Sequence, residues 1–203
     1  MRFNHIDYSH KYLENILSII REGILRRHAT LNKSKREVLN SQSLVEVFNI
    51  IGTTGKIWIG VQKEHEQETN MGKEDIYFHL NDDNCTCIFY VEAKRLPKYK
   101  TNKEEEYVVG KSSTGNPSGG IQRYKLEIHG SPYLQHNGMI AYVENKTIKD
   151  WLLIVNKKIE NEYPQDSLLT SINTQYEYTS THFYTNNEMK FKMHHFWIDL
   201  TNK

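Results

Sequence analysis

The first quarter of the chain places apolar residues at helical spacing. Between residues 8 and 31 they recur three or four positions apart, and the charged residues fall largely off that stripe. A second stripe runs from 41 to 51, and the glycine-containing segment 52–55 ends it. The pattern predicts two amphipathic helices, at 8–31 and 41–51.

The middle of the chain changes to the patterns of strands. Residues 56–61 form a short apolar run, and the polar stretch 62–73 after it is expected to be a loop. Residues 74–80 and 86–94 are each typical of a strand. The segment 81–85 between them is rich in Asn and Asp, which favour turns. The pattern predicts a β-hairpin over 74–94.

The last half alternates helical and strand patterns. Residues 97–118 show no regular spacing, and a short helix is expected over 121–129. The apolar run 138–143 is typical of a strand that is buried in a sheet. Thr147 is placed to cap a helix that ends at about residue 160.

A second hairpin is expected at the C-terminal end. Residues 179–185 and 190–200 alternate on either side of the Asn186-Asn187 turn. We expect this hairpin to lie at the edge of the sheet.

The first hairpin carries charged residues at one end. A tight turn centred on Asp83-Asn84 would pair Asp75 with Glu92 and would make the other face of the hairpin wholly apolar. Lys94 shares the face of Glu92, because alternate residues of a strand point to the same side. Directly opposed Cβ atoms are about 4.5–5.5 Å apart, so the two carboxylates would repel unless a cation lay between them. Mg²⁺ or Mn²⁺ suits such ligands; the alternative is a hairpin that ends in surface charges.

Asp75 and the run Glu92-Ala93-Lys94, together with the expected order of elements, resemble the PD-(D/E)XK nuclease superfamily. Glu74 stands where the motif has its proline. The resemblance implies an α/β (α+β) fold, in which a central mixed β-sheet is flanked by helices. It has the restriction-endonuclease-like αβββαβ core with an added C-terminal β-hairpin. We expect one domain over 1–203, with an N-terminal helical extension at 1–39, the core at 40–161 and the hairpin at 162–203.

The resemblance also implies a metal-dependent endonuclease acting on DNA, with Asp75, Glu92 and Lys94 as catalytic residues. Asp75, Glu92 and the backbone carbonyl of Ala93 would hold Mg²⁺ or Mn²⁺. Lys94 would orient or deprotonate the attacking water and steady the pentavalent phosphorane. Glu46 in the second helix would complete the metal site, with Glu22 as an alternative; Glu46 can equally be a solvent-exposed residue of that helix.

Candidate nucleic-acid contacts cluster after the motif. Basic and amide side chains there can meet phosphates, and the predicted helix N-terminus near Gly119-Gly120 adds backbone donors. An ordinary solvated surface is the alternative. The candidates are Arg95, Lys98, Lys100, Lys111, Gln122 and Arg123.

The composition of the chain limits the partners, metal sites and location that can be expected. The formal net charge of the 203 residues is +1, so any binding to nucleic acid depends on a local patch. Cys85 and Cys87 are expected to be reduced thiols, and the histidines show no zinc-binding framework. Neither a secretory segment nor an apolar run of about 20 residues occurs, so we expect a cytoplasmic protein without a membrane partner.

Three functional classes stay open. The first is a DNA endonuclease, by analogy the effector subunit of a restriction or anti-phage defence system. It would act as a homodimer or with a partner protein such as an ATPase, helicase or sensor subunit. The second is a non-catalytic nucleic-acid-binding or scaffold subunit that retains the fold. The third is an RNA-directed nuclease toxin.

Overall fold

The described chain begins with helices, and strands and shorter groups of helices follow. The computed structural model describes residues 9–54, 58–66, 73–97, 104–131, 133–172, 174–187 and 189–203. Its elements in chain order are α1 (Ser9–Arg27), the 3₁₀ helix η1 (His28–Thr30), α2 (Glu37–Thr54), β1 (Ile59–Glu66), β2 (Lys73–Leu80), β3 (Cys87–Leu96), the 3₁₀ helix η2 (Glu104–Tyr107), α3 (Gly120–Lys125), β4 (His136–Val143), α4 (Ile148–Glu162), β5 (Thr170–Ser171), β6 (Glu177–Phe183) and β7 (Lys190–Asp199).

The described strands form one seven-stranded mixed sheet in the order β1-β2-β3-β4-β7-β6-β5. β1, β2 and β3 are antiparallel neighbours, and β4 is parallel to both β3 and β7. β6 is antiparallel to both β7 and β5. The expected mixed α/β fold, with a central mixed sheet flanked by helices, is confirmed.

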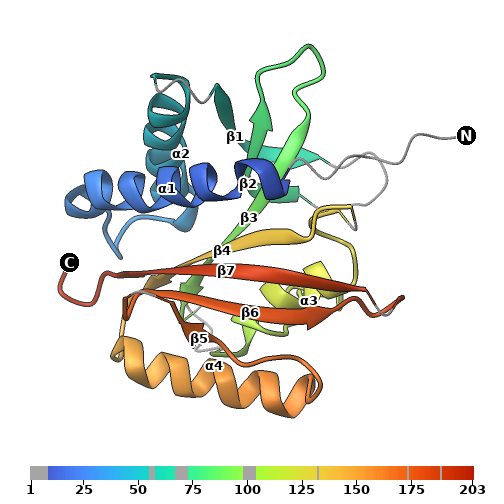
Figure 1. Cartoon of the computed structure of the whole chain (residues 1–203). Helices are drawn as coiled ribbons and strands as arrows, with labels where there is room; N and C mark the ends of the chain where they lie inside the picture. Colours follow the sequence, from blue (N-terminus) through green and yellow to red (C-terminus); the bar gives the residue numbers. More distant parts are fainter. Residues whose placement is uncertain are drawn as a thin grey trace, which may run out of the picture.

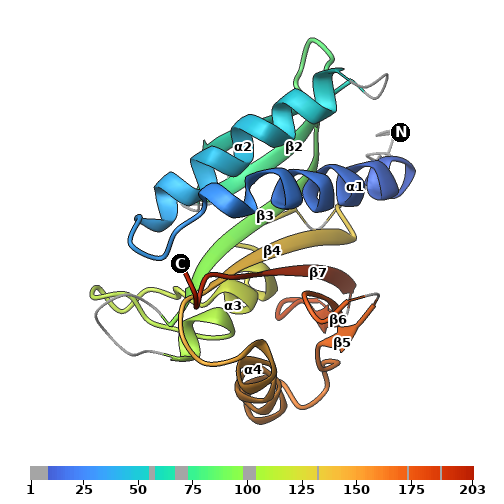
Figure 2. The same ribbon diagram turned by 90° about the vertical axis from the view of Figure 1, so that its left-hand side faces the viewer.

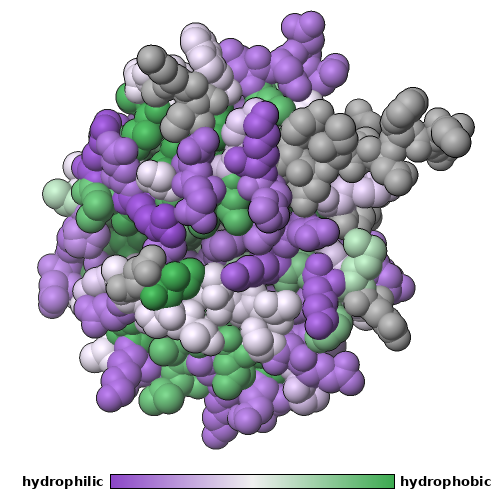
Figure 3. All heavy atoms as spheres, viewed as in Figure 1, coloured by the Kyte–Doolittle hydropathy of each residue, from purple (hydrophilic) through white to green (hydrophobic). Residues whose placement is uncertain are grey.

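Helices cover both faces of the sheet. α1 and α2 lie on one face, and α3 and α4 lie on the other (Figures 1 and 2). Each face has its own buried apolar cluster. Within the described part of the chain, every helix is too short or too polar to traverse a bilayer. The face seen in Figure 3 is largely polar, with apolar side chains in separate groups.

The α1–α2 face follows from the helical stripes and from the predicted hairpin. Ile16 and Ile20 of α1 and Phe48 of α2 are fully buried there. The ring of Phe48 packs on Phe78 of β2, and Phe78 packs edge-on against Phe89 of β3. The apolar face expected for the first hairpin therefore meets the two N-terminal helices.

Several element boundaries differ from the expected ones. The first helix ends at Arg27 and continues as η1, and α2 begins at Glu37 instead of residue 41. The buried positions at the start of α2 are polar (Asn40 and Ser41), and its apolar residues Val38 and Leu39 are exposed, so apolar spacing gives no sign of this start. β1 extends to Glu66, so the loop expected from residue 62 is wrong up to that point; residues 67–72 lie outside the described residues.

The C-terminal half shows two further differences. The expected second hairpin exists as β6 and β7 and lies at one side of the sheet, where the two-residue strand β5 pairs with β6 and forms the outermost strand. α3 ends at Lys125, and Glu127 follows with a positive φ of 56°, which is incompatible with a continuing α-helix. Thr147 caps α4 as expected, accepting a hydrogen bond from the backbone N–H of Asp150.

A hydrogen-bonded network is buried on the α3–α4 face. The carboxylate of Asp166 accepts a hydrogen bond from Lys125 Nζ at 2.7 Å and contacts His182 Nδ1 at 2.8 Å. His182 Nε2 lies 2.6 Å from Ser180 Oγ. Burial acts to raise the pKa of Asp166, but the hydrogen bonds from His182 and Lys125 outweigh it and lower that pKa. Asp166 is therefore ionised at neutral pH.

The network continues to η2 and has one direction. Ser180 Oγ lies 2.7 Å from His195 Nε2, and His195 Nδ1 lies 2.8 Å from the hydroxyl of Tyr107. Trp197 Nε1 donates to that hydroxyl at 3.0 Å. Burial lowers the pKa of both histidines, so each neutral ring has one donor and one acceptor. Because ionised Asp166 only accepts, every proton points from Trp197 towards Asp166.

Replacing the accepting end of this network is expected to destabilise the protein. Asp166→Asn leaves the buried ammonium of Lys125 without its carboxylate, which costs about 3–5 kcal/mol of unfolding free energy. Urea denaturation at neutral pH measures the loss. Asp150→Asn, which changes an exposed carboxylate of the α4 capping box, is the control and should lower stability much less than Asp166→Asn does.

The same variant has a defined pH dependence. Since the folded-state pKa of Asp166 is lowered, its contribution is present above the unfolded pKa of about 3.9 and is lost as pH falls through the folded pKa. The difference between wild type and Asp166→Asn should shrink in acid. Equal stability of the two proteins at neutral pH would contradict the assignment.

Candidate active site at the end of strand β3

β2 and β3 separate at a fork where Asp75 lies. The strands pair from Phe78 opposite Phe89 to Ile76 opposite Val91, so the predicted register is confirmed there; it shifts by one residue beyond Phe78. Past Val91, β3 continues along β4, and the structure records no further pairing of its described residues with β2. Asp75 Oδ2 accepts a hydrogen bond from the Ala93 N–H at 2.8 Å. The carboxylate of Asp75 thus accepts the hydrogen bond from β3 that a backbone carbonyl of a paired strand would otherwise accept.

Glu92 is buried at this fork, with only 1% of the residue exposed. Lys94 Nζ pairs with its Oε1, and Arg123 Nη1 approaches the same oxygen at 3.3 Å. His129 Nδ1 lies 2.9 Å from the other oxygen, Oε2. Burial acts to raise the pKa of Glu92, but the neighbouring charges, that of Lys94 first, hold it far below its usual value. The carboxylate is therefore ionised.

Glu37 adds a further carboxylate from the first turn of α2. Burial raises its pKa, and a hydrogen bond from the backbone of Arg95 partly opposes this. Glu37 was not expected in the site, because the helix was expected to begin four residues later. A signal existed: Glu37 continues the spacing of Ser41, Leu44 and Phe48, which form the buried face of α2.

The cluster carries more negative charge than its cations balance. Burial raises the pKa of Asp75 well above its usual value, and the charges of Glu92 and Glu37 add to the rise. The same carboxylates raise the pKa of Lys94 although burial acts to lower it, so the ammonium stays charged. Among the described residues, Glu37, Asp75 and Glu92 all act on Lys94, while Arg123 contacts Glu92 and the charge of Arg95 acts on Glu37. The site attracts further positive charge.

A cleft opens above this cluster. Its volume is about 330 Å³, and charged side chains make up most of its lining. Ser118 Oγ donates to Glu106 Oε1 at 2.8 Å on one wall. The lining residues are Arg36, Glu37, Val38, Lys94, Arg95, Glu106, Ser118 and Arg123. Arginine side chains around a polar hollow suit a phosphate group.

Two of the predicted nucleic-acid contacts line this cleft, Arg95 and Arg123. Both also have carboxylate partners: Arg95 donates to Glu144 at 2.5 and 2.7 Å, and Arg123 donates to Glu92. Both guanidinium groups thus contribute positive charge to the cleft, and their carboxylate partners fix their positions.

The other predicted contacts lie elsewhere or serve the backbone. Gln122 Oε1 accepts hydrogen bonds from the N–H groups of Gly110 and Gly119, so its expected role at a phosphate is replaced by a role in the loop. Lys111 is exposed and does not line the cleft. Lys98 and Lys100 fall outside the described residues.

The structure does not bring Glu46 or Glu22 to the cluster. The side chain of Glu46 is 55% exposed on α2, and its carboxylate lies 3.9 Å from Arg27. Glu22 pairs with Arg26 on the exposed surface of α1. Glu37 is the α2 carboxylate whose charge acts on Asp75 and Lys94.

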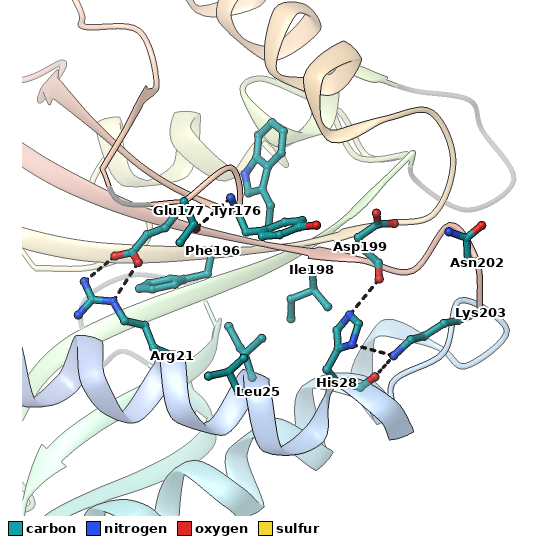
Figure 4. A pocket seen from close by; sticks show the side chains of 13 residues that line it. Arg21, Leu25, His28, Tyr176, Glu177, Phe196, Ile198, Asp199, Asn202 and Lys203 are labelled. Atoms are coloured by element: carbon teal, nitrogen blue, oxygen red, sulfur yellow. Dashed lines mark hydrogen bonds and ion pairs between the residues drawn. The ribbon is translucent and has the colours of Figure 1, made fainter.

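A second, larger hollow of about 510 Å³ lies between α1 and the β6–β7 hairpin (Figure 4). Apolar side chains such as Leu25, Phe196 and Ile198 line its middle. Arg21 closes one end by donating to Glu177 at 2.6 and 2.9 Å. This hollow is mainly apolar, and the carboxylate cluster lies at the other one.

No three His, Cys, Asp or Glu side chains among the described residues lie close enough together to form a metal site by themselves. Comparison with known proteins found no matching family model, no matching curated protein and no matching solved structure. The chemical role of the cluster therefore rests on its own residues.

Proposed function

We propose that this protein is a metal-dependent nuclease that hydrolyses phosphodiester bonds in DNA. The order of α2, the β1-β2-β3 meander, α3 and parallel β4 supports an αβββαβ core of the restriction-endonuclease type. Asp75, Glu92 and Lys94 meet at the end of β3, where the motif of that superfamily would put its active site.

One observation carries the proposal: the uncompensated carboxylates beside a cleft lined with arginine. The raised pKa of Asp75 and that of Glu37 mean that holding both acids ionised costs folding free energy. Such a cost is typical of functional sites, where activity opposes stability. A divalent cation would offset the repulsion, and the arginines would offset the charge of a phosphodiester.

The residues present fit Mg²⁺ or Mn²⁺. Glu92 is buried and ionised, and the raised pKa of Asp75 shows that this second carboxyl lacks sufficient nearby positive charge. Asp75, Glu92 and the Ala93 carbonyl would hold the ion, with Glu37 beside them. A bound ion would polarise the phosphate and lower the pKa of a bound water.

Lys94 and Arg123 supply fixed positive charge. Because the pKa of Lys94 is raised, its ammonium donates hydrogen bonds and does not act as a general base in this arrangement. It would orient the attacking water and stabilise the negative charge that develops on the phosphorane. Arg123 holds Glu92, and exposed Arg36 at the cleft would meet the phosphate backbone.

Loss of the site residues is expected to abolish cleavage. Asp75→Asn and Lys94→Met should each reduce nicking of plasmid DNA in Mg²⁺ or Mn²⁺ by about 100-fold or more, the scale of a lost electrostatic group. Parallel digests of duplex DNA, single-stranded DNA and total RNA identify the substrate. Circular dichroism verifies folding. Metal-dependent cleavage that persists in both variants would refute the assignment, and cleavage of RNA alone would favour an RNA-directed enzyme.

Glu37 and Glu46 form a matched pair on one helix. Glu37→Gln should weaken Mn²⁺ binding or cleavage by about 10–100-fold, as loss of a supporting carboxylate does. Glu46→Gln removes the same charge from an exposed position of α2 and should leave both unchanged. Calorimetric titration with Mn²⁺ measures the binding. The reverse result would place the site on the other side of α2.

Asp75→Asn should also stabilise the ion-free protein at higher pH. The folded state holds the Asp75 proton more tightly than the unfolded chain, so stability is lost as pH rises above the unfolded pKa of about 3.9. Asparagine still accepts the Ala93 hydrogen bond but never ionises. Urea denaturation across pH should show the stability of the variant, relative to wild type, increasing with pH. A stability difference between variant and wild type that does not change with pH would mean that nearby positive charge already compensates the ionised Asp75.

A further inference from the structure

Two separate segments of the chain form walls of the cleft beside the carboxylate cluster. The first is the connection from α1 to α2, residues 32–36, which contributes Arg36 to the lining. The second is the segment before α3, residues 110–118, which contributes Ser118. In Figure 2 these segments lie on the left, above and below the end of β3. A molecule that fills the cleft therefore meets both.

The first wall, which we call the basic turn (residues 32–36), is held in place by hydrogen bonds. Arg95 of β3 donates to the Lys33 carbonyl at 2.8 Å. Asn40 of α2, which is buried, donates to the Asn32 carbonyl at 2.9 Å and accepts from the Asn32 N–H at 3.3 Å. The basic turn is thus fixed to both β3 and α2.

The basic turn carries positive charge that the protein leaves uncompensated. Lys35 and Arg36 are exposed, and neither forms an ion pair with a described residue. Lys35 Nζ donates only to the backbone carbonyl of Thr30, at 3.0 Å. The chain has no Asp or Glu between Glu22 and Glu37. Fixed cations at the mouth of a polar cleft suit the phosphates of a nucleic-acid backbone.

The second wall, which we call the polar hairpin (residues 110–118), is fixed at its base and open at its tip. Gln122 of α3 accepts hydrogen bonds from the backbone at both ends of the hairpin. Within it, the Ser112 N–H donates to the Asn116 carbonyl at 2.8 Å. The chain turns at Gly115 with a φ of 85°, where a Cβ would meet no atom within 4 Å. The tip therefore projects into open space.

The tip offers hydrogen-bonding groups without charge. Ser113 and Asn116 are exposed, and their side chains have no partner among the described residues. Hydroxyl and amide groups both donate and accept, so they suit base edges in a groove of DNA. The two walls and the described lining of the cleft contain no aromatic residue, whereas single-strand binders stack bases on aromatic rings. The deep, narrow major groove of duplex RNA excludes side chains.

We propose that the basic turn and the polar hairpin hold duplex DNA across the cleft. The turn binds phosphates, and the hairpin reads base edges in a groove, so cleavage depends on the sequence beside the scissile phosphate. The cleavage step of this inference rests on the proposed function, whereas binding of DNA by the two walls can be measured without it.

Fluorescence anisotropy of the full chain with short duplex DNA in EDTA tests the turn. Lys35→Gln combined with Arg36→Gln should reduce the slope of log Kd against log salt by about 2, since each phosphate contact contributes ~0.9. Lys149→Gln combined with Lys157→Gln removes the same charge from exposed positions of α4 and should leave the slope unchanged. An unchanged slope in the turn variant, or an equal loss in the control, overturns the proposal. So does binding of single-stranded DNA or duplex RNA as tight as that of duplex DNA.

Cleavage of a random-sequence duplex pool in Mg²⁺, followed by sequencing of the cut ends, tests the hairpin. Wild type should favour particular bases beside the cut by about 10-fold, and Ser113→Ala combined with Asn116→Ala should reduce this bias to about 2-fold. Cuts without bias in wild type, or an unchanged bias in the variant, overturn the reading role.

The two experiments separate this inference from the proposed function. If duplex DNA binds with the expected dependence on the basic turn but is not cut, the proposed function fails alone; sequencing of the bound duplexes then replaces sequencing of the cut ends. If DNA is cut but neither wall affects binding or sequence bias, this inference fails alone. If duplex DNA is neither bound nor cut, both fail.

Discussion

Burial of the Glu92 carboxylate is the constraint on which the arrangement of the site depends. An ionised acid at 1% exposure requires close positive charge, and that charge comes from Lys94 on β3 and from Arg123 on α3. α3 must therefore pack against β3 in the connection that leads to parallel β4. The fork between β2 and β3 and the position of the cleft follow from the same pairing.

The carboxylate cluster holds more acidic groups than the stability of the fold requires. The charges of Glu37, Asp75 and Glu92 all act on the single ammonium of Lys94. Burial of the excess acid raises the pKa of Asp75 and that of Glu37, which a packed apolar corner would avoid. Of the three acids, Glu37 lines the cleft together with Lys94 and Arg123, and in the proposed function an external cation and a phosphodiester would complete the charge balance there.

The elements with a regular helical or alternating pattern of apolar residues could be predicted from the sequence. The register of the first hairpin was predictable because alternation sorts Ile76 and Phe78 from Tyr77 onto opposite faces. Glu37 was missed because the apolar residues at the start of α2, Val38 and Leu39, are exposed and the buried ones, Asn40 and Ser41, are polar. His129 was missed because its neighbourhood forms only through the chain reversal after α3. The outermost strand β5 was missed because its two residues are too few to show a pattern of alternation.

The chain of hydrogen bonds from Trp197 to Asp166 connects β7, β6 and η2. Ser180, His182 and Asp166 stand in the order of a hydrolytic triad, yet the serine proton and its oxygen lone pair are both committed to histidines. Turning one member around obliges all the others to rotate or exchange tautomers in concert. Because Glu106 in the wall of the cleft is the chain neighbour of Tyr107, a change in the protonation of Asp166 is coupled through this network to that wall.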